Sequence, residues 1–364
     1  MITPKLFTPG PVNVSDDVRL ALLHYDICHR TREFEELFID SQFKINKLFN
    51  ADDSYYSVII SGSGTAANEA VLSSVIFNEG EVVLLIKNGA FGEKLEEILN
   101  QYHIPTKVAT FEWASYPDLN IIENILLENP KVALVVMVFH ETSTGMINPV
   151  SEVGELCVKY GKKFFVDSVS AAGGEHINVL QNHIDFTTSV GGKCIGAFPG
   201  SAFICAKEVH LKKLKANQCR NTYLNLYKHY QFAVTKHQTP NTPNVTLFWA
   251  LNRAISNIMS EGLDSRISRY QSCAALLREG AQKLGLKLLL DSHMSNTVTT
   301  VFLPDGRNIS QFLSDLEAHG FLVYPGKGKY INMGGFQIAN MGEIYEADCQ
   351  VFLQELESVI RMYL

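Results

Sequence analysis

Short apolar runs alternate with amphipathic segments between residues 55 and 210. Several runs are continuously apolar, which is expected of strands in a mostly parallel sheet that helices cover on both faces. The pattern predicts an α/β fold with seven strands, at residues 57–61, 81–89, 107–111, 132–139, 163–169, 186–190 and 201–206. The helices predicted between them lie at residues 65–78, 91–102, 118–128 and 151–160.

From about residue 244 the pattern changes to longer amphipathic segments with few apolar runs between them. Helices are predicted at residues 245–260, 263–284, 309–318 and 344–362, and strands at 297–303 and 321–324. This arrangement is typical of a smaller α+β domain. We therefore expect an N-terminal segment at residues 1–20, a large domain at 21–245 and a small C-terminal domain at 246–364.

Composition favours a compact protein of the cytoplasm. The net charge is −7 and 46% of residues are hydrophobic, so neither nucleic acid nor a membrane surface is an expected partner. The longest apolar run, residues 132–139, is far shorter than the roughly 20 residues that cross a bilayer. The opening "MITPKLFTPGP" lacks the apolar region of a secretory signal. Seven scattered cysteines without a C-x-x-C pair indicate free thiols in a reducing compartment.

Candidate chemistry lies where the predicted strands end, because ligands of open α/β sheets bind at the carboxyl ends of the strands. The first strand is followed by "GSGTAANEA", in which Ser63, Gly64 and Thr65 stand at a helix start. Free N–H groups and the helix dipole make such a turn an anion site. The alternative is an ordinary Ser/Thr helix cap. The motif is not a P-loop, and it does not match the dinucleotide fingerprint in full.

Two further strand ends carry notable side chains. Phe91 follows the second strand and is placed either to stack on a planar ligand or to pack in the core. The fourth strand is followed by the polar run "HETST" at residues 140–144, which is costly to bury without partners. This run is therefore a candidate site loop. A metal site is the alternative, although no further ligand set at matching spacing is evident, and we expect no metal.

An acid and a lysine complete the series. Asp167 ends the fifth strand, and Lys193 follows one strand later in "SVGGKCIGAFPG". A lysine amine forms a Schiff base with a carbonyl, and pyridoxal 5′-phosphate (PLP) needs an acid at its ring nitrogen and an anion site for its phosphate. Each residue alone has an ordinary structural explanation. Their order along one sheet predicts a PLP site.

The chain resembles the class V aminotransferases, which are PLP-dependent enzymes of fold type I. Within that family it looks most like the 2-aminoethylphosphonate:pyruvate transaminases. The resemblance extends over nearly the whole chain and rests on an ordered series of motifs: "LFTPGPVNVSDDVRLALL", "HYDICHRTREFEELF", "GSGTAANEAVL", "NGAFGEKL", "ETSTGMINP", "VDSVSAAGG", "SVGGKCIGAFPGSAF", "TPNTPNV" and "VYPGKGK".

The resemblance implies a role for each matched residue. Lys193 and Asp167 are expected to be catalytic, with Lys193 bonded to PLP and Asp167 paired with its ring nitrogen. The other implied cofactor contacts are Val169 and Phe91 on the two ring faces, Thr142 near the phenolic oxygen, and Ser63, Gly64, Thr65, Thr239 and Thr242 at the phosphate. Thr239 or Thr242 is expected to come from a partner subunit, since members of the family are homodimers with shared sites. Gly10 and Arg30 are expected to border the substrate.

One position departs from the family pattern. Relatives carry an arginine that grips the acidic group of the substrate, and this chain has Gln337 there, in "GGFQIANMGEI". Glutamine supplies neither a charge nor a bidentate fork. Arg30, Lys327 and Lys329 remain as alternative sources of charge, although a solvated turn in "PGKGKY" is the expected role for both lysines. The usual substrate pair is therefore an open question.

The sequence thus predicts an aminotransferase that moves an amino group between a small amine and a keto acid or aldehyde. The amine is expected to bear a phosphonate or phosphate, as 2-aminoethylphosphonate does. A PLP-dependent lyase or decarboxylase on the same fold is the alternative enzyme. A PLP-binding regulator without turnover is the alternative outside catalysis, although no fused DNA-binding segment is visible.

Overall fold

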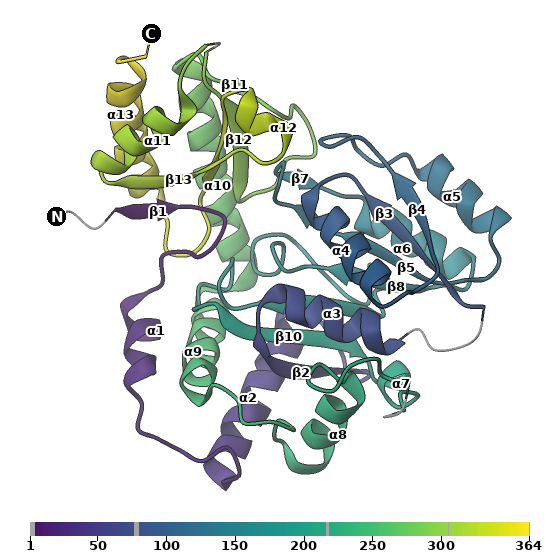
Figure 1. Cartoon of the computed structure of the whole chain (residues 1–364). Helices are drawn as coiled ribbons and strands as arrows, with labels where there is room; N and C mark the ends of the chain where they lie inside the picture. The colour runs from purple at the N-terminus through teal and green to yellow at the C-terminus, as the bar shows by residue number, and fades with distance from the viewer. Residues whose placement is uncertain (1–3, 76–79, 216–217, 305, 364) are drawn as a thin grey trace.

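The larger half of the molecule is built on one seven-stranded sheet (Figure 1). The computed structural model describes residues 4–75, 80–215, 218–304 and 306–363. β10 runs antiparallel to both its neighbours, and the remaining pairs are parallel, so the predicted mostly parallel sheet is confirmed. In order across the sheet the strands are β2 (Tyr55–Gly62), β10 (Gly200–Lys207), β9 (Phe186–Val190), β8 (Lys163–Asp167), β5 (Val132–Val138), β3 (Val82–Lys87) and β4 (Thr106–Thr110).

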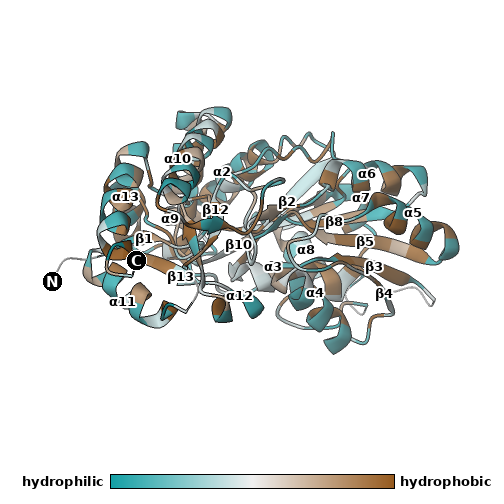
Figure 2. Ribbon diagram, turned by 90° about the horizontal axis from the view of Figure 1, so that it is seen from above, coloured by the Kyte–Doolittle hydropathy of each residue, from teal (hydrophilic) through white to brown (hydrophobic). Residues whose placement is uncertain are grey.

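Helices cover both faces of this sheet, which explains its continuously apolar strands. Figure 2 shows α3 and α4 on one face and α2 and α6 on the other. Each predicted helix of this half is present within a few residues, and positions 76–78 of the first lie outside the described residues. The helices of this half are α1 (Asp16–Leu20), α2 (Arg32–Leu48), α3 (Gly64–Val75), α4 (Ala90–Gln101), α5 (Leu119–Glu128), α6 (Val150–Lys159), α7 (Glu208–Leu211), α8 (Leu226–Lys236) and α9 (Val245–Glu261).

A second sheet of five strands forms the smaller half. Its order is β1 (Lys5–Phe7), β13 (Phe321–Pro325), β14 (Gly335–Ala339), β12 (Val298–Phe302) and β11 (Lys287–Leu288). The first strand of the chain pairs in parallel with β13, so the N-terminal segment crosses from the small sheet to the large half. The helices beside this sheet are α10 (Leu263–Lys283), α11 (Ile309–Ala318), α12 (Lys329–Asn332) and α13 (Glu346–Ile360).

Several elements were not predicted from the pattern. They are β1, α1, α2, α7, α8, β11, α12, β14 and the small hairpin of β6 (His140–Glu141) and β7 (Met146–Ile147). The hairpin lies within the predicted polar loop. Within the described ranges, no helix has both the length and the hydropathy that a bilayer-spanning segment needs.

The two halves meet around a small buried cluster. Val12, Cys194, Tyr270, Met341 and their neighbours form an apolar core distinct from those of the two sheets. Cys194 directly follows Lys193, so the loop that carries this lysine is packed between the halves. The candidate site therefore lies at the junction of the two sheets, where ligand sites of α/β proteins are commonly found.

Candidate functional site

A cavity of about 290 Å³ opens at the ends of the large-sheet strands, beside the N-terminal turn at Gly10 and Pro11. It collects side chains from five separate segments of the chain. Eight of the predicted site residues line it: Gly10, Ser63, Gly64, Thr65, Phe91, Asp167, Val169 and Lys193. The predicted strand-end chemistry is thus brought together in one place, as the topology of the sheet requires.

Lys193 presents an amine that is unusually easy to deprotonate. Burial lowers the pKa of its ammonium group to about 8, and the charge of Lys327 acts in the same direction. Its Nζ donates a hydrogen bond to the carbonyl oxygen of Pro9 in the N-terminal turn. The uncharged amine is the nucleophile that attacks a carbonyl carbon. Lys193 is therefore suited to covalent chemistry with an aldehyde near neutral pH.

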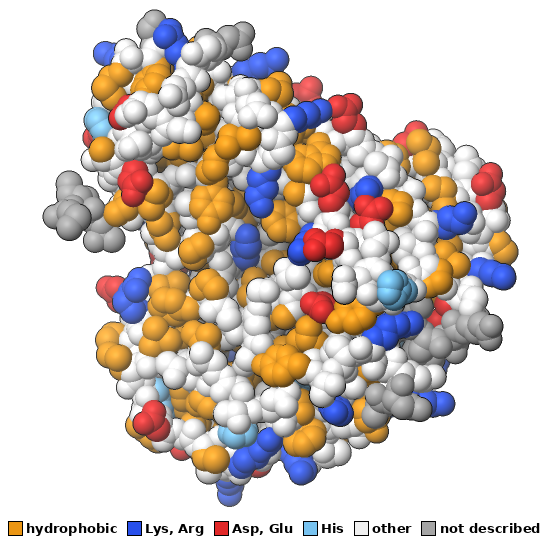
Figure 3. Space-filling view, viewed as in Figure 1, with side chains coloured by type: hydrophobic (Ala, Val, Ile, Leu, Met, Phe, Trp, Pro, Cys, Tyr) orange, Lys and Arg blue, Asp and Glu red, His pale blue; other side chains and the backbone are white. Residues whose placement is uncertain are grey.

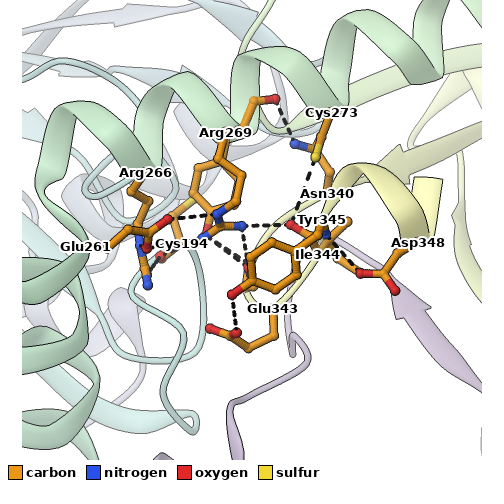
Figure 4. A network of polar contacts seen from close by, with 12 residues as sticks. Cys194, Glu261, Arg266, Arg269, Cys273, Asn340, Glu343, Ile344, Tyr345 and Asp348 are labelled. Atoms are coloured by element: carbon orange, nitrogen blue, oxygen red, sulfur yellow. Dashed lines mark hydrogen bonds and ion pairs between the residues drawn. The ribbon is translucent and has the colours of Figure 1, made fainter. Parts of the chain in front are cut away.

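The backbone that follows Lys193 is held by α10. Arg266 Nη1 donates to the carbonyl oxygen of Cys194 at 3.2 Å, and the Tyr270 hydroxyl donates to the same oxygen at 3.2 Å. Arg266 is itself fixed by an ion pair with Glu261 at 2.7 Å, as Figure 4 shows. Because the guanidinium is buried and paired, it holds the loop without freedom to swing. These positioning residues lie more than sixty positions from Lys193 in the sequence, and no local signal identified them.

Asp167 lies at the end of β8 and is buried at the floor of the cavity. Its carboxylate accepts hydrogen bonds from Asn68 Nδ2 at 2.6 Å and from the Val169 amide at 2.9 Å. Thr188 in turn donates to Asn68 Oδ1 at 2.5 Å, which fixes the amide of Asn68. Burial raises the pKa of Asp167 above the ordinary value, and the two hydrogen bonds oppose that rise only in part. A buried acid of this kind is stabilised when a cation lies beside it.

Asn68 was not predicted as a site residue. It lies four positions after Gly64, so both face the same side of α3. A polar residue on the otherwise apolar inner face of a helix was the available signal.

The opposite end of the cavity can receive an anion. Ser63, Gly64 and Thr65 form the N-terminal turn of α3, a helix of twelve residues. Amide groups and hydroxyls gather there together with the positive end of the helix dipole. Glycine is required at residue 64, because a Cβ there would lie 2.6 Å from the γ carbons of Val169. The turn therefore packs directly against the residue expected beneath a planar ring.

The buried run at residues 140–144 has its own polar partners. The Glu141 carboxylate is fully buried and accepts from the amides of Phe91 at 3.2 Å and Gly92 at 3.1 Å, the first turn of α4. Ser143 donates to the same carboxylate. Glu141 therefore caps α4 and fixes Phe91 at the cavity wall.

Replacing Glu141 with alanine is expected to destabilise the protein by about 1–3 kcal/mol, because buried amides of α4 lose their acceptor. Urea unfolding at neutral pH measures the loss. Glu97→Ala on the exposed face of the same helix, where the Lys94 pair is solvated, is the matched control and is expected to cost less than about 0.5 kcal/mol. Equal stability of the two variants would contradict this account of Glu141.

Five predicted site residues lie outside the cavity lining. Arg30 Nη1 donates to the carbonyl oxygen of Thr239 at 2.8 Å and to Gln238 Oε1 at 2.9 Å, so Arg30 and Thr239 form one unit. Thr242 belongs to the same segment, just before α9. Thr142 is buried behind the cavity wall, with its hydroxyl 3.5 Å from that of Ser170.

Gln337 is the fifth and lies fully buried in the middle of β14. Its Nε2 donates to the Thr142 carbonyl at 2.7 Å and to Thr300 Oγ1 at 3.1 Å. Both donor positions of the amide are therefore engaged within the protein. A contact between this side chain and a substrate remains a prediction.

The groups around the cavity fit PLP. The Lys193 amine, with a pKa of about 8, suits its aldehyde. The buried carboxylate of Asp167 suits its ring nitrogen, and the N-terminus of α3 suits its phosphate. Phe91 and Val169 both border the same space, as a planar ring requires. In the described part of the chain, no group of three or more His, Cys, Asp or Glu is placed to hold a metal ion.

Comparisons with known proteins agree with this chemistry. The family model of the class-V aminotransferases matches residues 19–328. The chain is 33% identical to 2-aminoethylphosphonate–pyruvate transaminases of Vibrio vulnificus and Klebsiella pneumoniae, with 98% of this chain and 97% of each relative covered. It is 32% identical to an uncharacterized aminotransferase of Methanocaldococcus jannaschii, with 98% of this chain and 92% of that relative covered.

Solved structures share the whole architecture. Alanine–glyoxylate aminotransferase from Nostoc sp. superimposes with a TM-score of 0.91 at 26% identity, covering 99% of this chain and 96% of the other. Ureidoglycine–glyoxylate aminotransferase from Bacillus subtilis gives 0.91 at 27% identity, covering 100% and 94%. The predicted fold type, enzyme class and cofactor are thereby confirmed, and the alternative lyase is not favoured. The chain belongs to the class-V aminotransferases and is a PLP-dependent enzyme of fold type I.

Proposed function

We propose that this aminotransferase acts on a small amine that bears a phosphonate or phosphate, and passes the amino group to a keto acid or aldehyde. The observation that carries the proposal is the meeting of Lys193, Asp167 and the α3 N-terminus in one cavity. The full-length similarity to 2-aminoethylphosphonate–pyruvate transaminases supports the choice of amine. A cavity of about 290 Å³ suits small reactants.

The roles proposed for the protein's residues follow from their chemistry. When bound, PLP supplies an electron sink for the bond that breaks at the substrate carbon. Lys193 would hold the cofactor through its Nζ, and the same amine, with its lowered pKa, would serve as the general base and acid that takes up and returns a proton. Asp167 would hold the ring nitrogen of the cofactor and favour its protonated form. Ser63, Gly64 and Thr65 bind the phosphate.

Further roles are proposed around this centre. Phe91 and Val169, which both border the cavity, would hold the cofactor ring between them, and Thr142 would contribute near the phenolic oxygen. Gly10 is proposed to border the substrate because its backbone adjoins Lys193: a Cβ at residue 10 would lie 2.9 Å from the lysine Cδ. Gln337 is proposed to shape the substrate end of the site through its bond to the Thr142 carbonyl.

We also propose a homodimer in which Arg30, Thr239 and Thr242 complete the partner's site. These residues lie outside the cavity lining of their own chain, which supports a role across an interface. Hydrophobic side chains gather over α1 and α9 on the face seen in Figure 3. Leu20, Leu23 and Tyr25, which precede Arg30, are 63%, 79% and 66% exposed. Such exposure is typical of a protein contact.

The net charge of −7 supports partners other than nucleic acid, and the free cysteines support a cytoplasmic location.

The substrate is tested by single-turnover reactions of the PLP-loaded protein. With 2-aminoethylphosphonate, we expect one equivalent of aldehyde per site and recovery of the original absorbance when pyruvate is added. Ethylamine, which has the same chain without the acid, is expected to react at least about tenfold more slowly, since a charged hydrogen bond is worth about 1.5–3 kcal/mol. Equal rates would overturn the substrate proposal. Release of carbon dioxide or ammonia without amino transfer would instead indicate the lyase.

A further inference from the structure

A second lysine approaches the cavity from the small half of the molecule. Lys327 lies in the turn between β13 and α12, and its ammonium lies 4.7 Å from the centroid of the Phe91 ring. Phe91 is part of the cavity wall. The cation is therefore held against the site by an aromatic face, an attraction that is modest when the cation is partly solvated.

The Lys327 ammonium has no carboxylate partner within the described ranges. Lys329, two residues later, differs in this respect: it forms an ion pair with Glu112 at 2.7 Å and is 54% exposed. Lys327 is only half-buried, but it is close enough to Lys193 for its charge to lower the pKa of that amine. Two amines directed at one cavity repel each other, and an anion between them relieves that repulsion.

Two carboxylates already near the cavity do not supply the anion that would relieve the repulsion between Lys193 and Lys327. Asp167 is occupied by Asn68 and the Val169 amide, and Glu141 by the first turn of α4. The cofactor phosphate has its own donors at Ser63 and Thr65, which belong to the large half. The remaining source of an anion for Lys327 is therefore the substrate, the second molecule that enters the cavity.

The other basic residues left open by the sequence are engaged elsewhere. Arg30 is bound to the segment at residues 238–240, and Lys329 to Glu112. Gln337 is neutral, buried and hydrogen-bonded inside the protein. In Figure 3, basic side chains lie in the hollow between the small-sheet half at upper left and the large-sheet half. The expected solvated turn therefore describes Lys329 and not Lys327.

We propose that Lys327 is the specificity-determining cation of this enzyme, and that it binds the phosphonate or phosphate of the amine substrate from the β13–α12 turn. The inference rests on the proposed function. A lysine ammonium is a compact charge with three donors. It suits a rounded phosphonate better than a planar carboxylate, whose two oxygens match the fork of an arginine. The phosphonate is accordingly expected to bind more tightly than a carboxylate of the same length.

The test uses the PLP-loaded protein and ethylphosphonate, which has no amine and so reports only on the anion site. Calorimetry compares the wild type with Lys327→Gln, Lys327→Arg and the matched control Lys329→Gln. We expect Lys327→Gln to weaken ethylphosphonate binding by about 10- to 100-fold, Lys327→Arg to retain most of it, and Lys329→Gln to equal the wild type. Propionate is expected to bind more weakly than ethylphosphonate to the wild type. The rate preference for 2-aminoethylphosphonate over ethylamine is expected to fall in Lys327→Gln alone.

Three outcomes would overturn the inference. One is wild-type affinity for ethylphosphonate in Lys327→Gln, and another is no binding of ethylphosphonate by the wild type. The third is loss of PLP affinity by Lys327→Gln with unchanged ethylphosphonate binding in the loaded fraction, which would assign the lysine to the cofactor phosphate. The proposed function fails separately, when the wild type reacts with ethylamine as fast as with 2-aminoethylphosphonate.

Discussion

Replacement of Lys193 by alanine is expected to abolish transamination and to leave the protein unable to hold PLP covalently. Its amine lines the cavity and has a pKa of about 8 because of burial. Loss of a nucleophile that also moves the proton is expected to lower the rate by at least about 10³-fold, since general acid–base catalysis alone contributes about 10²–10⁴-fold. Borohydride reduction of the PLP-loaded protein, followed by peptide mass analysis, measures the attachment directly.

Two further variants show whether the loss of activity comes from the missing amine, from the missing charge or from a general effect of replacing a lysine. Lys193→Arg keeps a positive charge, but its guanidinium stays protonated and is expected to be as inactive as the alanine variant. Lys212→Ala removes a lysine that is 63% exposed and paired with Glu208 on the surface, and is expected to behave as the wild type. A borohydride-trapped adduct on a peptide other than the one that contains residue 193 would refute the assignment.

The large sheet was predictable because its strands are buried on both faces and therefore read as unbroken apolar runs. The strands at 132–138 and 82–87 pair with neighbours that are parallel and covered, so local composition was sufficient. β1 and β14 were not predictable in this way. β1 is three residues long and pairs with a strand more than three hundred positions away, and β14 contains Gln337 at its centre.

The cavity was predictable for a related reason. The residues that line it stand at strand ends, and parallel strands bring their carboxyl ends to one edge. The residues that orient these side chains reach them through tertiary contacts, and no local sequence pattern identifies such residues. Arg266 reaches the Lys193 loop from α10, and Glu141 reaches Phe91 from the next strand over. Lys327 was expected in a solvated turn, because only the packing of the small half against the large one brings it to Phe91.

Replacement of Asp167 by asparagine is expected to lower activity and to change how the stability of the protein depends on pH. The substitution keeps the size of the side chain and one of its two acceptor oxygens, and it removes the charge that we assign to the ring nitrogen. Transamination is expected to fall by about 10²–10³-fold, the typical effect of deleting one electrostatic stabiliser. Steady-state kinetics measures this loss. Asp53→Asn, at an exposed turn, is the matched control and is expected to leave the rate unchanged.

The stability of the PLP-free protein is expected to respond to pH at this position. Burial raises the pKa of Asp167 in the folded state above its unfolded value, so the folded protein holds a proton that the unfolded chain releases. Stability from this group therefore falls as pH rises from the unfolded pKa through the folded one. Asparagine has no such proton. The melting temperature of Asp167→Asn relative to the wild type is thus expected to rise as the pH increases above the unfolded pKa of an aspartate.

Added PLP distinguishes a functional charge from a merely buried one. A ligand stabilises the folded state according to its affinity, and a protonated ring nitrogen beside Asp167 removes the cost of the buried carboxylate. Addition of PLP is therefore expected to raise the melting temperature of the wild type by more than that of Asp167→Asn. Equal gains together with an undiminished rate would mean that the carboxylate serves only its bonds to Asn68 and the Val169 amide. A larger gain in the wild type would mean that the chain retains a destabilising charge at this position because the cofactor requires it.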